Sequence, residues 1–441
     1  MNILLFNFIL YSIWSAFTLF KERRITIYSA LVLFYLIVAF LGYYTVSSGI
    51  YYDVFGFTPL STLQLEPYIY AIATYMILFW PLRNIKLEDH RTDAIFSKKV
   101  ALCLKIWVGY FSLFTILKLF EAVASITLGL GDTYDARHVD GQELFVYDNI
   151  ILQKFNGYGF FLLNATVPFV MAYVFIGLNK KRISNTYAVV LIFLSYVPSI
   201  LSGIAMGSRG SLFMTSFCFV FFILLFWRFI PKSFLSKIYL YGLIFVSLVL
   251  IYSWMITSDR VGKGSEGFNS ILRYFGESFP NLGFIFWDNV KYHPMGLRFF
   301  PNFLIENEKS LYTSVDDSYQ YWGFKTGVPV LNFKTYFGDL YIEFGLMYAF
   351  AFVTGCSILV KKFFSHYKVN VFNLSFLYFY YQLCIFAFAG FTKDGHQAFF
   401  QLMIVVIVSI GLKYITRSPK RVRRNQTLNR KGTWNTSKVQ H

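Results

Sequence analysis

Apolar segments follow one another along almost the whole chain, and polar residues are mostly confined to the stretches between them. A run of about 20 apolar residues can cross a hydrocarbon core of about 30 Å as a helix. Eleven such segments predict an all-α, multi-pass membrane protein. The predicted spans are residues 2–20, 25–46, 67–82, 100–122, 151–178, 186–206, 211–228, 238–257, 337–360, 371–389 and 398–416.

One long polar stretch, residues 258–336, separates the eighth predicted span from the ninth. Polar residues are the exception in such a chain, so we expect function to concentrate in this loop. Residues 1–416 are predicted to form a single transmembrane domain that holds the loop at one face of the membrane. The polar residues 417–441 predict a basic, disordered cytoplasmic tail.

Composition and charge agree with this pattern. Of the 441 residues, 56% are hydrophobic and only 14% are charged, whereas a soluble domain has about 25% charged residues. With the N-terminus outside, the predicted inner connections hold 26 of the 40 Lys and Arg residues but only four acidic residues, as the positive-inside rule requires. The net charge of +17 therefore indicates anionic membrane lipids as partners and argues against nucleic acid. The inner connections are residues 21–24, 83–99, 179–185, 228–237, 361–370 and the tail from residue 413.

Arg209 is the most distinctive single candidate. It lies in the sequence Gly-Ser-Arg-Gly at residues 207–210, between the sixth and seventh spans on the predicted outer face. Flanking glycines let a ligand approach the backbone closely, and the arginine points a planar, permanently charged group into the space between helices. An arginine at a helix end can equally extend to lipid headgroups, and both interpretations stay open.

Asp339 and Glu343 stand four residues apart at the start of the ninth span. This spacing places both carboxylates on one face of a helix. Carboxylates within a membrane helix are costly to bury and usually serve function, with a basic partner such as Lys334 or Arg209 to offset the charge. A purely structural ion pair is the alternative interpretation.

Several further polar residues on the predicted outer face could bind an anionic substrate, although each could also be an ordinary solvated residue. The outward histidines are scattered and lack the spacing of metal ligands, so no metal site is predicted. No P-loop or Ser-His-Asp pattern occurs, and no cofactor is predicted. The candidate substrate-binding residues are Arg137, His138, Arg260, Arg273, Arg298, Lys334 and His396.

Three features together resemble one known family. They are the Gly-Ser-Arg-Gly turn, the long late outer loop, and the run Asn-Phe-Lys-Thr-Tyr-Phe-Gly-Asp-Leu-Tyr-Ile-Glu-Phe-Gly at residues 332–345 that leads into the next span. This combination resembles the bacterial O-antigen polymerases, also called Wzy-type oligosaccharide repeat-unit polymerases. The chain departs from the family pattern in having Glu343 where Asp is expected, and Leu346 and Met347 where a second glycine is expected.

The resemblance implies a glycosyltransferase of the bacterial inner membrane, with its active site facing the periplasm. Such an enzyme joins oligosaccharide repeat units carried on undecaprenyl pyrophosphate, during lipopolysaccharide or surface polysaccharide biosynthesis, without a nucleotide sugar or a metal. Arg209, Asp339 and Glu343 are then the expected catalytic residues, because cations stabilise the departing pyrophosphate and a carboxylate can accept the acceptor's proton. A chain-length regulator protein is a further candidate partner.

Two other functions remain alternatives. An O-antigen ligase shares the general plan, but we would expect a well-placed loop histidine, and His293 is the available one. A lipid-linked oligosaccharide flippase or other transporter would also be polytopic. Transporters usually contain paired repeats, whereas this sequence shows none and has a long outer loop that a transporter has little use for.

Overall fold

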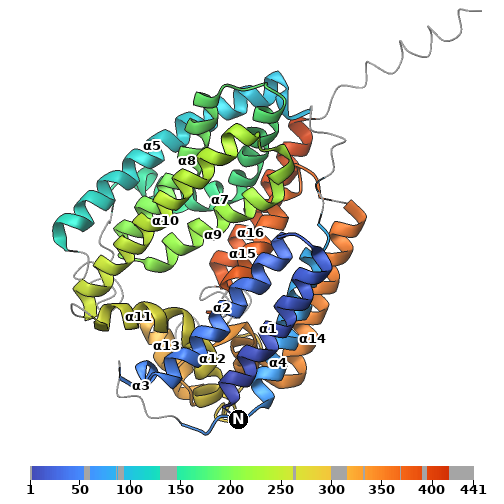
Figure 1. Cartoon of the computed structure of the whole chain (residues 1–441). Coiled ribbons are helices and arrows are strands. Elements are labelled where there is room, and N and C mark those ends of the chain that lie inside the picture. Colours follow the sequence, from blue (N-terminus) through green and yellow to red (C-terminus); the bar gives the residue numbers. More distant parts are fainter. Residues whose placement is uncertain are drawn as a thin grey trace, which may run out of the picture.

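Helices make up nearly all of the computed structural model (Figure 1). The structure describes residues 2–53, 60–85, 87, 94–129, 147–261, 265–298, 315–330, 333–367, 369–389 and 395–416. Within these residues the extended pairing is limited to one isolated bridge between Leu87 and Val369, so the predicted all-α class is confirmed for this part of the chain. The longer helices are α1 (Ile3–Glu22), α2 (Ile27–Ser47), α4 (Glu66–Phe79), α5 (Lys98–Leu128), α7 (Ile150–Asn179), α8 (Asn185–Ala205), α9 (Arg209–Phe226), α10 (Lys232–Val261), α14 (Thr335–Tyr367), α15 (Leu374–Phe386) and α16 (Gly395–Ile415). The shorter ones are α3 (Ile50–Asp53), η1 (Trp80–Leu82), η3 (Trp227–Phe229), α11 (Ser265–Gly276), α12 (Ser278–Asn281), the π-helix η4 (Leu282–Phe286) and α13 (Val315–Thr326).

Among the described residues, nine helices are long and apolar enough to cross a membrane. They are α1, α2, α5, α7, α8, α9 continued by η3, α10, α14 and α16. Many of their apolar side chains point outward, for example Phe20 at 82% and Leu243 at 68% exposure, which a lipid surround would cover. The chain is therefore a multi-pass membrane protein.

The prediction of eleven full-length spans holds only in part. Every predicted segment contains a helix, but α4 has 14 residues and α15 has 13. At 1.5 Å per residue they extend about 20 Å, which is less than the hydrocarbon thickness of about 30 Å. Helix α4 gains one further turn from η1. Nine long spans and two short helices, all within the described residues, replace the uniform set of eleven.

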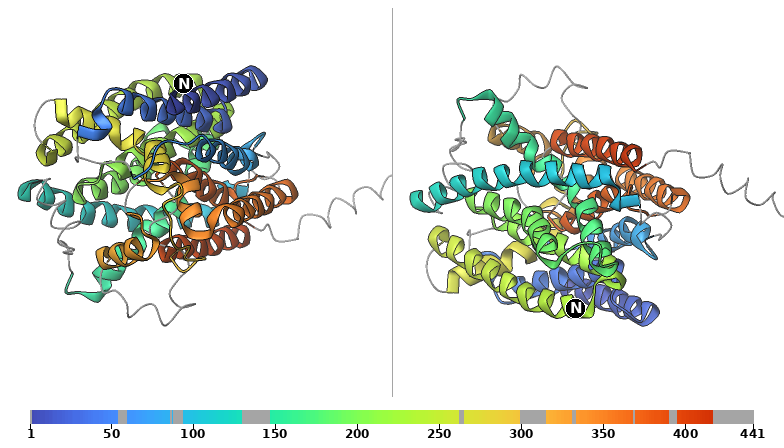
Figure 2. Two further views of the ribbon diagram at one scale, coloured as in Figure 1. Left: turned by 90° about the horizontal axis from the view of Figure 1, so that it is seen from below. Right: turned by 90° about the horizontal axis from the view of Figure 1, so that it is seen from above.

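Two of the predicted inner connections meet at one end of the bundle, in the residues that the structure describes. The bridge from Leu87 to Val369 joins the connection after α4 to the connection after α14. Lys361 Nζ donates to the Arg83 carbonyl oxygen at 3.5 Å in the same region. We call this the basic end. Helix α16 also finishes there, as the views in Figures 1 and 2 show.

Short helices cover the opposite end, where α1 begins (Figure 1). The predicted loop 258–336 is largely helical where the structure describes it, with α10 extending to Val261 and α11, α12, η4 and α13 following. Residues 60–64 form hydrogen bonds with η4 and with the turn after it. Ser61 Oγ donates to the Gly283 carbonyl at 3.0 Å, and Gln64 Nε2 donates to Asp288 at 3.0 Å. Residues far apart in sequence thus build one layer over this end.

Buried tyrosines fix the start of α14 beneath that layer. The Tyr75 hydroxyl donates to the Ala387 carbonyl at 2.7 Å, and the Tyr336 backbone N–H donates to the same carbonyl at 2.6 Å. The ring of Tyr75 lies 4.4 Å from that of Tyr35 and 6.4 Å from that of Phe279 in α12. The first turn of α14 is therefore held against the end of α15.

Candidate functional site

Helix α14 is broken at Gly345, which has φ 73° and ψ 177°. This left-handed conformation favours glycine, and a Cβ there would also lie 3.4 Å from His293 Nε2. The break frees carbonyl groups of the preceding turn. The loop at 293–298 satisfies them: Met295 N–H donates to the Glu343 carbonyl at 2.8 Å, and His293 Nδ1 lies 3.0 Å from the Ile342 carbonyl.

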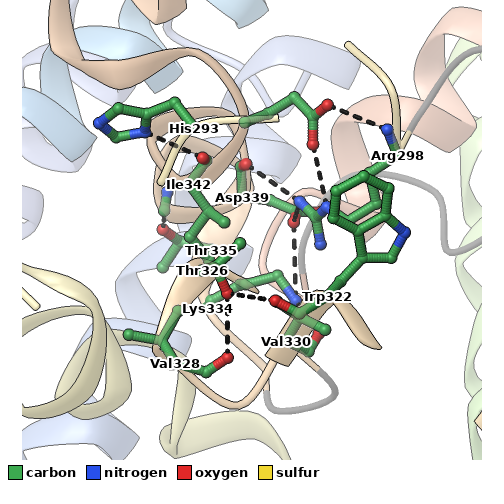
Figure 3. Close-up of polar contacts among 12 residues, drawn as sticks. His293, Arg298, Trp322, Thr326, Val328, Val330, Lys334, Thr335, Asp339 and Ile342 are labelled. Atoms are coloured by element: carbon green, nitrogen blue, oxygen red, sulfur yellow. Dashed lines mark hydrogen bonds and ion pairs between the residues drawn. The ribbon is translucent and has the colours of Figure 1, made fainter. Parts of the chain in front are cut away.

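Arg298 contacts both candidate carboxylates, and Figure 3 shows its contact with Asp339. Its Nη2 lies 2.5 Å from Asp339 Oδ1, and its Nε lies 2.9 Å from Glu343 Oε2. The predicted shared face of Asp339 and Glu343 is therefore confirmed. The sequence analysis named Lys334 or Arg209 as the basic partner of these carboxylates. In the structure Arg298 contacts both carboxylates, and Lys334 Nζ lies 3.6 Å from Asp339 Oδ1.

The charges of Arg298, Asp339 and Glu343 are buried, so each needs the opposite charge beside it. Asp339 is 3% exposed and Glu343 is 0% exposed. Burial alone would lower the pKa of Arg298, but the negative charges of Asp339 and Glu343 outweigh burial and raise it. The guanidinium therefore stays charged. Removing one partner from such a group leaves an uncompensated buried charge.

The two carboxylates have different surroundings. Glu343 Oε1 accepts from the Gly296 N–H at 2.7 Å and from the Arg298 N–H at 3.2 Å, while Oε2 binds the guanidinium. Glu343 thus ties the loop to α14. Asp339 receives its contacts from the side chains of Arg298 and Lys334, which can move without unfolding the backbone.

Lys334 immediately precedes α14 and is 5% exposed. Its ammonium donates to the Val330 carbonyl (Figure 3) as well as facing Asp339. The next residue, Thr335, has φ 65°, and its hydroxyl accepts from the Gly338 N–H at 3.1 Å. This cap starts the helix directly after the lysine and so sets the position of Asp339 one turn later.

Arg209 forms a second cationic group with residues of α10 and α11. Its Nη1 donates to Thr257 Oγ1 at 2.6 Å, and its guanidinium carbon lies 5.3 Å from the centre of the Tyr274 ring. A Cβ at Gly210 would lie 2.6 Å from the Tyr274 hydroxyl oxygen. The glycine expected to admit a ligand therefore admits this tyrosine.

Arg273 and Glu277 belong to the same group. Arg273 Nε lies 2.9 Å from Glu277 Oε2, and its guanidinium carbon lies 5.8 Å from the Tyr51 ring centre. Burial raises the pKa of the Glu277 carboxyl, while the charges of Arg273 and Arg209 act in the opposite direction. The two arginines therefore act on one carboxylate.

Phe333 joins the two groups. Its ring lies 4.9 Å from that of Tyr274, and its carbonyl accepts from Asn281 Nδ2 at 2.7 Å. Its neighbour in sequence, Lys334, faces Asp339. The structure thus brings six predicted residues to one end of the bundle in two groups that Tyr274, Phe333 and Lys334 connect: Arg209 and Arg273 form one, and Arg298, Lys334, Asp339 and Glu343 form the other.

The other predicted residues are not placed by side-chain geometry. Arg137 and His138 lie outside the described residues, and Arg260 and His396 lie in α10 and α16 with side chains outside the description. Sequence reasoning did not select Glu277, and it treated His293 only as evidence on a ligase. Neither had a local motif, because the contacts of both depend on the folded arrangement of the outer layer.

No group of three or more His, Cys, Asp or Glu side chains suited to a metal ion occurs in the part of the chain that the structure describes. The site is instead a set of cations and carboxylates, which can bind an anion, orient a hydroxyl and accept a proton. No family model matches the sequence, and no curated protein or solved structure is significantly similar to it.

Proposed function

We propose that this protein is a membrane glycosyltransferase that polymerises lipid-linked oligosaccharide repeat units. The observation that supports this most strongly is the convergence of Arg298 and Lys334 on two buried carboxylates, beside the Arg209 group and opposite the basic end. A donor with a pyrophosphate leaving group needs such cations, and an acceptor hydroxyl needs such a carboxylate. Under the positive-inside rule this end faces the periplasm of a bacterial inner membrane.

In the proposed reaction, an acceptor sugar hydroxyl attacks the anomeric carbon of the donor glycan. A new glycosidic C–O bond forms, and the C–O bond to the undecaprenyl pyrophosphate breaks with its electron pair leaving on the pyrophosphate. Asp339 accepts the proton of the hydroxyl. Arg209 and Arg298 bind the pyrophosphate through paired N–H groups.

Arg298 connects binding to proton transfer in this proposal. Its guanidinium holds Asp339 at 2.5 Å. A bound pyrophosphate competes for the same guanidinium, so its arrival releases Asp339 to act as a base. Glu343 keeps its backbone bonds to Gly296 and Arg298 during this exchange, so the loop stays in place.

His293 favours one alternative, the O-antigen ligase. Its ring lies against the break in α14, with Nδ1 3.0 Å from the Ile342 carbonyl. A histidine held at this break, in the outer layer, could take part in sugar transfer onto lipid A-core. The polymerase would extend a lipid-linked glycan, whereas the ligase would join a glycan to lipid A-core.

The lipopolysaccharide of a deletion strain tests the proposal. Loss of a polymerase leaves a single repeat unit on the core, whereas loss of a ligase or flippase leaves none. We expect the single-unit pattern, and restoration of the ladder by the wild-type gene but not by an Asp339→Asn variant. A core without any repeat unit would reject the polymerase assignment.

A further inference from the structure

A cavity of about 490 Å³ opens at the basic end, between α1, α4 and α14. Its walls are mostly apolar, with Trp14 and Phe17 from α1, Met76 and Trp80 from α4 and η1, and Ile358 from α14. Ile358 lies about five helical turns along α14 from Asp339. The cavity is therefore distinct from the candidate site, and its ligand does not depend on the proposed function.

Three cations surround the mouth of this cavity. Lys21 and Arg83 line it directly, and Lys361 Nζ lies 5.7 Å from the ring centre of Trp80, another lining residue. Within the described part of the chain, none of the three has a carboxylate at ion-pair distance. The cavity's own carboxylate, Glu22, accepts a hydrogen bond from the Thr26 hydroxyl.

The cavity extends over most of the depth of one lipid leaflet. On α1 its lining runs from Trp14 to Glu22, which corresponds to about 12 Å at 1.5 Å per residue. Half of a hydrocarbon core is about 15 Å thick. The charged mouth therefore lies at the level of phosphate headgroups, and the apolar walls extend through most of the depth of the acyl chains.

We propose that this cavity binds one anionic glycerophospholipid from the leaflet at the basic end. The headgroup phosphate contacts Lys21 and Arg83, with Lys361 beside them, and one acyl chain lies along Phe17, Met76 and Ile358. Charge complementarity selects an anionic headgroup over a zwitterionic one, since a net positive mouth attracts net negative charge. The bound lipid fills the space between α1 and α14.

Native mass spectrometry of the delipidated full chain tests this with phosphatidylglycerol and phosphatidylcholine as probes. We expect one retained phosphatidylglycerol per chain and weaker retention of phosphatidylcholine. The double variant Lys21→Gln with Arg83→Gln should weaken phosphatidylglycerol binding roughly 30-fold, at about fivefold per cation. The control, Lys98→Gln with Lys99→Gln, removes equal charge from exposed positions at the start of α5 and should retain the lipid.

A second pair of variants tests the apolar part with every charge intact. Thr354 lines the cavity, so Thr354→Trp should fill it and reduce lipid retention. The control is Leu359→Trp, at a side chain that is 69% exposed on the same helix. If the charge variant fails to fold, this pair still tests whether a lipid binds in the cavity. Equal binding of both phospholipids, equal losses in variant and control, or displacement of phosphatidylglycerol by a polyprenyl phosphate would each overturn the proposal.

Discussion

The backbone N–H of Gly296 donates a 2.7 Å hydrogen bond to Oε1 of Glu343, a side chain without exposed surface. The other carboxylate oxygen, Oε2, lies 2.9 Å from Arg298 Nε. Both oxygens thus hold the loop against the broken helix. This division favours Glu343 as the structural carboxylate of the pair and Asp339 as the one that meets substrate.

Replacing Glu343 by Gln should destabilise the protein. The amide presents N–H groups where a carboxylate accepted, so Arg298 loses a buried counter-charge. We expect a loss of about 3–5 kcal/mol in the free energy of unfolding. Thermal unfolding of the purified protein measures this. The control Glu66→Gln, at an exposed carboxylate that begins α4 at the same end, should change stability by less than about 0.5 kcal/mol. Equal melting temperatures for the two variants would contradict the structural role.

Local spacing explains why part of this site could be predicted. A four-residue separation fixes a shared helix face whatever the rest of the chain does, and so Asp339 and Glu343 were expected together. The identity of their main partner could not be predicted in the same way. Arg298 lies 41 residues before Asp339 in sequence, and only folding of the outer layer brings the two together.

The same limit applies to the glycines and the short helices. A single glycine within an apolar helical run is usually tolerated, so the break at Gly345 had no distinctive local signal. Gly210 was expected to let a ligand approach, whereas the hydroxyl that lies close to it in the structure belongs to Tyr274. Apolar length predicted the helices well, whereas the short lengths of α4 and α15 depend on the neighbours that bury them.

Arg209→Lys should lower polymer formation sharply while the protein still inserts. Lysine keeps the charge but loses the planar fork that can bind a pyrophosphate and lie near the Tyr274 ring. We expect a loss of at least about tenfold in polymer formed from a lipid-linked repeat unit. Thr257→Val, which removes the 2.6 Å hydrogen bond and keeps the arginine, should lose less. A full ladder from an Arg209→Ala strain would remove this residue from the site.

Glu277 should make stability depend on pH. Burial raises the pKa of its carboxyl, and Arg273 and Arg209 offset that effect only in part. The folded chain therefore holds this proton more tightly than the unfolded chain, so the associated stability is greatest below the ordinary pKa of about 4.3 and falls as pH rises through the raised value. Glu277→Gln cannot ionise and lacks this fall.

The melting temperature of Glu277→Gln relative to wild type should consequently increase between about pH 4 and about pH 7. Thermal unfolding across that range measures the difference. Glu66→Gln is the control, because its carboxylate is exposed and lies outside this group. A difference that stays constant or decreases with pH would show that Glu277 does not titrate as described.

Reporter fusions test the orientation of the whole bundle. Reporters that act only outside the cytoplasm should be active after Ser47, Gly131 and Gly264, and inactive after Asp93 and Lys420, because this alternation leaves every basic connection in the cytoplasm. Fusions with a cytoplasmic reporter should give the opposite pattern. An inactive external reporter at Gly264 would place the carboxylate site on the wrong face for a periplasmic transferase.

Asp339→Asn tests the chemistry at the site while the loop stays attached to α14. The amide keeps the shape of the side chain, and Glu343 still holds the loop through Gly296. Loss of the base should lower the rate of sugar transfer about 10²–10⁴-fold. Because Lys334 and Arg298 lose a negative neighbour, an anionic donor should bind at least as tightly as before. Purified protein with a lipid-linked repeat unit would measure both quantities. A variant that transfers sugar at the wild-type rate, or that loses donor binding and rate together, would exclude Asp339 as the base.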